Sequence, residues 1–183
     1  QKTVFPIQRT EMLTYTVPQG SQSHIKENLF HGQLPKLLIL GFVNNEDFNG
    51  KIDTNPFWMR HKHVTHVGVY KDGMPIPHEP FKPDFENHIC AFEYMSLLNA
   101  LNLFNGNDSI DITKNEYMGG YSLFAFNLSP DKTIAGHGQP LQDGNLRIEL
   151  RFKNSLDKAI NVIAMAVFDD QIEISRLRKV TMN

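Results

Sequence analysis

The feature that most constrains the fold of this chain is an alternating stretch near its C-terminus. Between residues 146 and 153, apolar residues alternate with charged ones in the order Leu-Arg-Ile-Glu-Leu-Arg-Phe-Lys. Successive side chains of a strand point to opposite faces, so this pattern predicts a strand with one buried face and one solvated face.

The residues that follow predict two more strands. Residues 160–168 are almost all apolar and rich in β-branched types, which is typical of a strand covered on both faces. Asp169 and Asp170 are predicted to turn the chain, because a short carboxylate side chain bonds its own backbone. Ile172 and Ile174 then alternate with polar residues. Three antiparallel strands in series predict a meander and an all-β domain.

The rest of the chain supplies further strand candidates and one helical pattern. Asp72-Gly73 predicts a hairpin turn. The other predicted strands cover residues 1–20, 34–43, 57–71, 74–76 and 121–128, with the turn residues Pro18-Gln-Gly20 closing the first of them. Residues 21–33, 44–55 and 107–120 are predicted loops. An apolar stripe at three-residue steps, from Ile89 to Phe104, predicts a helix over about residues 88–105.

About eight antiparallel strands in two facing sheets predict a jelly-roll sandwich with one inserted helix. At 183 residues, the whole chain, residues 1–183, is expected to form a single domain.

Composition excludes several classes of protein. Apolar residues make up 40% of the chain, which is too much for disorder. The net charge of -2 and the absence of long charged runs argue against a nucleic-acid surface or a polybasic membrane patch. Cys90 is the single cysteine, so no internal disulfide is possible. No apolar run approaches the ~20 residues of a spanning helix, so we expect a soluble chain with no membrane partner.

His61, His63 and His66 are the strongest candidates for chemistry. Histidines two apart in a strand point to one face, and cupins use such a pair as metal ligands. A cupin also needs a nearby Glu ligand, and the positions after His66 hold Val67, Gly68 and Val69 instead. The favoured interpretation is a polar strand face, and a cupin-like metalloenzyme using His61 and His63 is the alternative. No carboxylate pair suggests acid–base catalysis, so we predict no enzyme activity and no cofactor.

Four residues are candidates for subunit contacts. Arg147, Glu149 and Arg151 form a charged stripe that is expected to be solvated, but at an interface such a stripe would set partner choice. Trp58 follows Asn55-Pro56-Phe57 and is more typical of a core or loop residue than of an interface. A lectin-like module using Trp58 and Tyr117 is a third hypothesis, which rests on fold analogy alone.

Several segments, taken in order, resemble the major capsid proteins of Polinton (Maverick) elements and adintoviruses. They are Gly-Tyr-Ser-Leu-Phe-Ala-Phe-Asn-Leu-Ser-Pro-Asp at 120–131, Gly-Asn-Leu-Arg-Ile-Glu-Leu-Arg-Phe at 144–152, Val-Phe-Asp-Asp-Gln-Ile-Glu-Ile at 167–174 and Arg-Lys-Val at 178–180. The Leu34-Pro pair, the Asn55-Pro56-Phe57 turn and the prolines after Asp72-Gly73 are also similar.

The resemblance implies a structural protein. Members of this family have two eight-stranded jelly rolls, and three subunits form a pseudo-hexagonal capsomer of an icosahedral shell. This chain has room for one roll, which would be the C-terminal one, and the missing roll puts the trimer in doubt. The implied partners are identical subunits and other capsid proteins, with no sequence-specific nucleic acid. The implied location is the virion capsid, assembled inside the host cell. A host-domesticated copy with another binding role is the remaining alternative.

Overall fold

A computed structural model describes residues 3–30, 32–101, 103, 111–129, 143–175, 178 and 180–182. Its strands are β1 (Thr3–Val17), β2 (Ser23–Lys26), β3 (Leu37–Asn44), β4 (Val64–Lys71), β5 (Met74–Pro75), β6 (Phe124–Asn127), β7 (Leu146–Phe152), β8 (Ile160–Ile174) and β9 (Val180–Met182). Its helices are α1 (Asn45–Phe48), α2 (Ala91–Ala100) and α3 (Lys114–Gly120).

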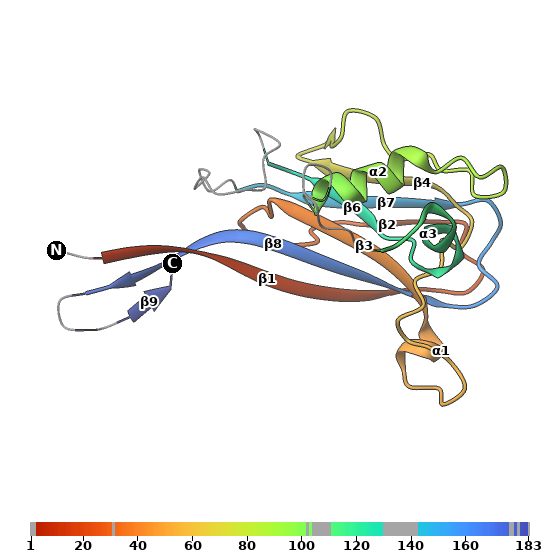
Figure 1. The fold of residues 1–183 in the computed structure, drawn as a ribbon, viewed down its shortest axis with the longest axis horizontal. Helices are drawn as coiled ribbons and strands as arrows, with labels where there is room; N and C mark the ends of the chain where they lie inside the picture. The colour runs from red at the N-terminus through yellow and green to blue at the C-terminus, as the bar shows by residue number, and fades with distance from the viewer. Residues whose placement is uncertain are drawn as a thin grey trace.

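Strands β1 to β8 form two facing antiparallel sheets, and this order defines the fold. One sheet runs β1-β8-β3-β6, with β9 added beside β8, and the other runs β2-β7-β4-β5. Among the described strands, those that follow each other in sequence therefore lie in different sheets, except for the directly paired β4–β5 and β8–β9. Figure 1 shows the two layers, with α2 and α3 beside β6. This is a jelly roll, so the predicted all-β jelly-roll class is confirmed.

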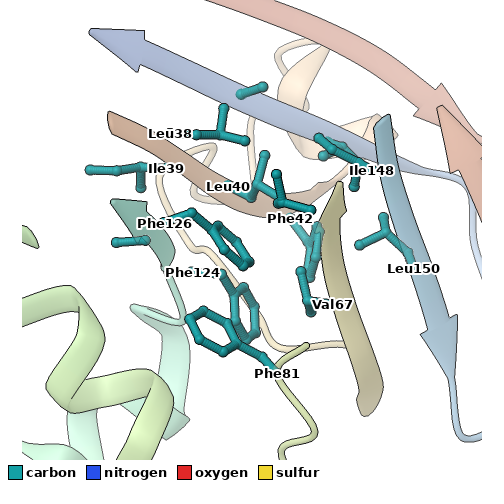
Figure 2. Close-up of a cluster of buried hydrophobic side chains, with 14 of the residues drawn as sticks. Leu38, Ile39, Leu40, Phe42, Val67, Phe81, Phe124, Phe126, Ile148 and Leu150 are labelled. Carbon is teal, nitrogen blue, oxygen red and sulfur yellow. The ribbon is translucent and has the colours of Figure 1, made fainter. Parts of the chain in front are cut away.

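The core lies between the two sheets. It is built from the inward faces of β3, β4, β6 and β7, and Phe42 on β3 contacts both Phe124 and Phe152. Phe81, from the loop after β5, stacks on Phe126 at a ring distance of 4.5 Å. Figure 2 shows Phe42 and Phe124 of one sheet facing Val67 and Ile148 of the other. The alternation predicted for residues 146–152 is confirmed, because the four apolar side chains of β7 are buried.

The hairpin at Asp72-Gly73 is also confirmed. Both residues have positive φ, +49° and +85°, as a two-residue hairpin turn requires. Asp72 also accepts a hydrogen bond from the backbone N–H of Asn145 at 2.8 Å, which ties the turn to the start of β7.

The predicted meander is wrong. β7 and β8 lie in different sheets, and Asp169-Asp170 is not a turn, because β8 runs straight through it as a 15-residue strand. Two cations, one on β1 and one just before β3, neutralise the carboxylates. Lys36 Nζ lies 2.5 Å from Asp169 Oδ1, and Arg9 Nε lies 3.2 Å from Asp170 Oδ2. Because these cations bind the carboxylates, the two side chains do not have to bond their own backbone in a turn.

The inserted helix is shorter than predicted and buries a different face. α2 ends at Ala100, inside the predicted range, and it buries Glu93, Leu97 and Ala100. Ile89 and Phe92 of the predicted stripe are mostly exposed, because the helix rests on β6 through its other side. Phe104, the last residue of the stripe, lies outside the described residues.

Three elements lie in segments that were predicted to be irregular. β2 lies within 21–33, α1 within 44–55 and α3 within 107–120. α3 starts with a capping box, in which Thr113 accepts from the backbone N–H of Glu116 and the Glu116 carboxylate accepts from that of Thr113. Residues 57–63, which were predicted to be extended, belong to no strand. None of the helices in the described ranges is long and apolar enough to cross a membrane.

Candidate assembly surfaces

The most prominent surface is an arm that projects from the sandwich. β8 pairs with β3 only from Ile160 to Val167, while β1 continues beside it to the last residue of β8. We call this projecting part, residues 3–9 of β1, residues 168–174 of β8 and strand β9, the arm. Figure 1 shows it extending beyond both sheets, with the two chain ends at it.

One face of the arm is mostly apolar, with Asp170 opposite Ile7 as its charged member. Phe5 is paired with Ile172, so the two side chains point to the same side, and Ile7 and Ile174 follow on that side at period two. This is also the side on which Phe168 enters the core, but past the sandwich no second sheet formed by the described residues covers it. Phe5 is accordingly 48% exposed. Soluble proteins rarely leave a connected apolar face open without a partner for it.

A cluster of ion pairs around Arg9 lies at the base of the arm, where it joins the sandwich. Arg9 contacts Asp170 and Glu11, and its guanidinium lies 4.7 Å from the centre of the Phe168 ring. These contacts hold β1 and β8 in register at the point where the pairing of β8 with β3 stops. The arm is therefore a defined extension of the sheet.

The charged stripe of β7 lies on the outer face of the second sheet. Glu149 accepts hydrogen bonds from Arg151 at 2.9 and 2.5 Å, and the Arg147 guanidinium lies 4.4 Å from the centre of the Tyr70 ring. Burial raises the pKa of Glu149, but the Arg151 hydrogen bond and the charges of Arg151, His66 and Arg147 together lower it by more. Glu149 and Arg151 pair with each other, Arg147 pairs with Glu27, and Arg151 remains exposed to solvent. The role of the stripe in subunit contacts stays a prediction.

Trp58 is held against the end of α3. Its Nε1 donates a hydrogen bond to the carbonyl of Gly119 at 2.9 Å, and the Arg60 guanidinium lies 3.7 Å from its ring centre. Trp58 thus packs within its loop and fixes it against α3, as the favoured interpretation expected. Its side chain remains 43% exposed. Tyr117, the other residue of the lectin-like hypothesis, is fully buried, so it offers no ring to a glycan.

His61 and His63 lie on a turn before β4, so the strand geometry assumed for them is wrong. Lys62 and His63 both have positive φ, and the backbone N–H of His63 donates to Nδ1 of His61 at 2.9 Å. The His61 ring stacks on Phe85 at 4.1 Å. Burial, and then the charges of His63 and Lys62, lower the pKa of His61 to about 4.

These two histidines do not make a recognisable metal site. Nδ1 of His61 is already used by a backbone N–H, and His63 faces Glu86 at 3.9 Å. His66 lies on β4, opposite Arg151. Within the described ranges, no group of three His, Cys, Asp or Glu side chains could hold a metal ion. Both histidines instead line an open groove of about 560 Å³ with Trp58, Arg60, Lys62, Met118, Gly119, Asn154, Ser155, Leu156 and Asp157.

A second groove, of about 680 Å³, is apolar and lies between β5, β6 and α2. Met74 and Phe92 on its walls are largely exposed. Phe81 and Phe126, which stack on each other, close its floor. It lies against edge strands of both sheets.

Sequence reasoning missed the arm. The signal was present in residues 3–9, where Val4, Phe5 and Ile7 continue the first strand well beyond the length a sandwich needs. This signal was not recognised because Asp169-Asp170 suggested a turn. A turn there would end β8 before residues 170–174, which are the partners of residues 3–7 of β1.

Comparison with known proteins supports the fold. No protein-family model matches the chain. An uncharacterized protein of Caenorhabditis elegans is 28% identical over 178 residues, which are 95% of this chain and 42% of that protein. The chain therefore spans less than half the length of this relative.

Several solved structures match the whole chain, among them the following three. One is the Sputnik virophage structure, with a TM-score of 0.57 and 14% identity over 39% of the matched chain. A PBCV-1 protein fitted into a reconstruction of Sputnik gives 0.53 at 9% identity, and a PBCV-1 virus capsid gives 0.51 at 9%, each over 51% of its chain. At these identities the likeness concerns the fold, and the match covers between 39% and 51% of each longer chain.

Proposed function

We propose that this chain is a structural building block of a viral capsid, working by self-association and without catalysis. The observation that carries the proposal is the pair of strand orders β1-β8-β3-β6 and β2-β7-β4-β5, together with the whole-chain match to the Sputnik virophage structure. A stiff sandwich suits this work, because symmetry repeats the same modest contacts many times.

The chain serves as one roll of a double jelly-roll subunit. The solved chains that it matches are about two to two and a half times as long as the matched part, and the Caenorhabditis elegans relative is similarly longer. Three such subunits form a pseudo-hexagonal capsomer, as in the Polinton-type proteins whose segments this sequence resembles. The site of action is then the virion capsid, after assembly inside the host cell.

Contact residues are proposed on the charged stripe and at Trp58. Arg151 is the best probe, because its side chain is 61% exposed and its ion pair is with Glu149 on its own strand. Replacing it changes the surface and leaves the core intact.

Sedimentation velocity over a range of protein concentrations tests the proposal. We expect assemblies larger than one chain that grow with concentration, and an Arg151→Glu variant that associates more weakly. Lys51→Glu is the matched control, since Lys51 pairs with Glu46 on the α1 loop, away from the stripe. A single-chain mass at every concentration would contradict self-association by this chain.

The metalloenzyme alternative has little support. His61 and His63 lie on a turn that uses one ring nitrogen for a backbone hydrogen bond. A cupin site would need both rings free and a third ligand beside them.

A further inference from the structure

We propose that two copies of this chain join through the free edges of their β1 strands, antiparallel about a twofold axis at Thr10. The inference rests on the proposed self-association and names one contact surface for it. Each step below uses the backbone register and the charges of β1.

β1 is the terminal strand of its sheet. It pairs with β8 on one side, and none of the described strands lies on its other side. Met12 is 67% exposed, and Thr10 and Thr14 are exposed as well. A long edge strand presents a row of unpaired N–H and C=O groups, which is a template for another chain.

The alternation of backbone groups identifies which β1 residues face this edge. On β8 and its approach, the carbonyls of Ala159 and Asp169 accept hydrogen bonds from Asn45 and Gln33, on the β3 side. Backbone groups alternate along a strand, so the odd-numbered residues of β8 face β3 and the even-numbered ones face β1.

Even-numbered β8 residues are paired with odd-numbered β1 residues, as in Arg9 with Phe168. The even-numbered residues of β1, from Val4 to Thr16, therefore direct their N–H and C=O groups to the free edge. Pro6 is one of them, so its missing N–H costs the β8 ladder nothing.

Charge then selects one register for the second copy. Antiparallel pairing must set even-numbered residues opposite even-numbered ones. Centring the axis on Arg9 would oppose two arginines, and centring it on Glu11 would oppose two glutamates, which is unfavourable for pairs directly opposite. Centring it on Thr10 sets Arg9 of each copy opposite Glu11 of the other.

The same register covers the arm. Phe5 falls opposite Tyr15 of the second copy, and Ile7 falls opposite Leu13, all on the core side of the sheet. Aromatic and aliphatic cross-strand pairs of this kind are favourable. In each copy, His24 on β2 stacks on Tyr15 at 5.5 Å, so the ring that Phe5 of the second copy would meet is already held in place by its own chain.

Engineered cysteines test the register. Under mild oxidation, Thr10→Cys should form a covalent dimer, because the two Thr10 Cα atoms would lie about 5.5 Å apart, within disulfide reach. Thr16→Cys is the control on the same exposed face of the strand, and its two copies would lie about 40 Å apart. We expect at least ~10-fold more covalent dimer for Thr10→Cys, as the geometric requirement of a disulfide dictates. Equal yields for both variants would overturn the proposal.

A second variant tests the edge without relying on oxidation. Met12→Pro removes an N–H that faces the free edge and no bond to β8, so the folded chain is retained while pairing is lost. Circular dichroism and a thermal melt check the fold, and sedimentation reports the pairing. A folded Met12→Pro variant that pairs like the parent chain would overturn the proposal. Assemblies that form without a Thr10 cross-link would refute this interface and leave the proposed function standing, while a single-chain mass for the parent would refute both.

Discussion

The indole of Trp58 donates its N–H to the carbonyl of Gly119 and lies against the Cα of the next residue, Gly120. A methyl group at Gly120 would overlap the indole ring, whereas one at Gly119 would meet no atom within 4 Å. Two adjacent glycines of α3 therefore have opposite tolerance for a side chain. This contact couples the loop before β4 to the helix before β6.

We predict that Gly120→Ala destabilises the protein by about 1–3 kcal/mol, because the indole must move away from its Gly119 and Arg60 contacts to make room. Gly119→Ala is the matched control. It should be neutral or stabilising by up to about 1 kcal/mol, since alanine favours a helix over glycine. Urea unfolding of both variants measures the difference. Equal effects of the two substitutions would mean that Trp58 does not pack as described.

Stability should fall as the pH drops through the range set by His61. Its pKa is about 4 in the folded protein, where burial is the main cause, and 6.5 when unfolded. Between these two pH values the unfolded state binds more protons than the folded state. The free energy of unfolding therefore decreases as the pH falls from 6.5 to 4. The half-exposed ring limits the effect to about 1–2 kcal/mol.

A His61→Asn variant separates this contribution from that of other histidines. Burial also lowers the pKa of His24 and His66, so the parent chain has a composite pH dependence. Asparagine can still accept the hydrogen bond from the His63 N–H but does not titrate. Urea unfolding at pH 7.5 and pH 4.5 should show a smaller loss in the variant, and an unchanged loss would remove His61 as its source.

The aromatic centre of the core should dominate stability. Phe42 is fully buried and contacts Phe124 and Phe152, so Phe42→Ala is expected to cost about 3–5 kcal/mol. Phe57 is 76% exposed, and Phe57→Ala is expected to stay within about 0.5 kcal/mol. A large loss for Phe57→Ala, measured by thermal unfolding, would show that the loop carrying it packs more tightly than described.

Added metal should not bind stoichiometrically at the two histidines. Calorimetric titration of the purified chain with zinc, manganese or iron(II) is expected to give the same weak signal for the parent chain and for His63→Ala. One metal per chain, lost in His63→Ala, would instead support the cupin-like alternative. The physical reason is that Nδ1 of His61 already accepts a backbone hydrogen bond.

Local sequence patterns correctly predicted a strand with one buried face and a hairpin turn of specific residue types. The period-two alternation in β7 and the Asp72-Gly73 turn each depend on neighbouring residues alone, and both are confirmed. The Thr113-to-Glu116 spacing of the capping box was also visible, although it lies in a polar segment that suggested a loop.

Features that depend on distant residues could not be predicted. Asp169 and Asp170 continue a strand because Lys36 and Arg9, more than a hundred positions earlier, neutralise them. Likewise, nothing local shows that His63 adopts positive φ, since it is not a glycine. The arm, which depends on both chain ends pairing with each other, was missed for the same reason.

Electron microscopy of the purified chain, and of a longer relative that contains this roll, tests the central claim most directly. The account predicts particles built from repeated copies, with three-fold capsomers that look six-sided in class averages. Isolated single-chain particles for both proteins, at concentrations where capsid proteins assemble, would contradict it.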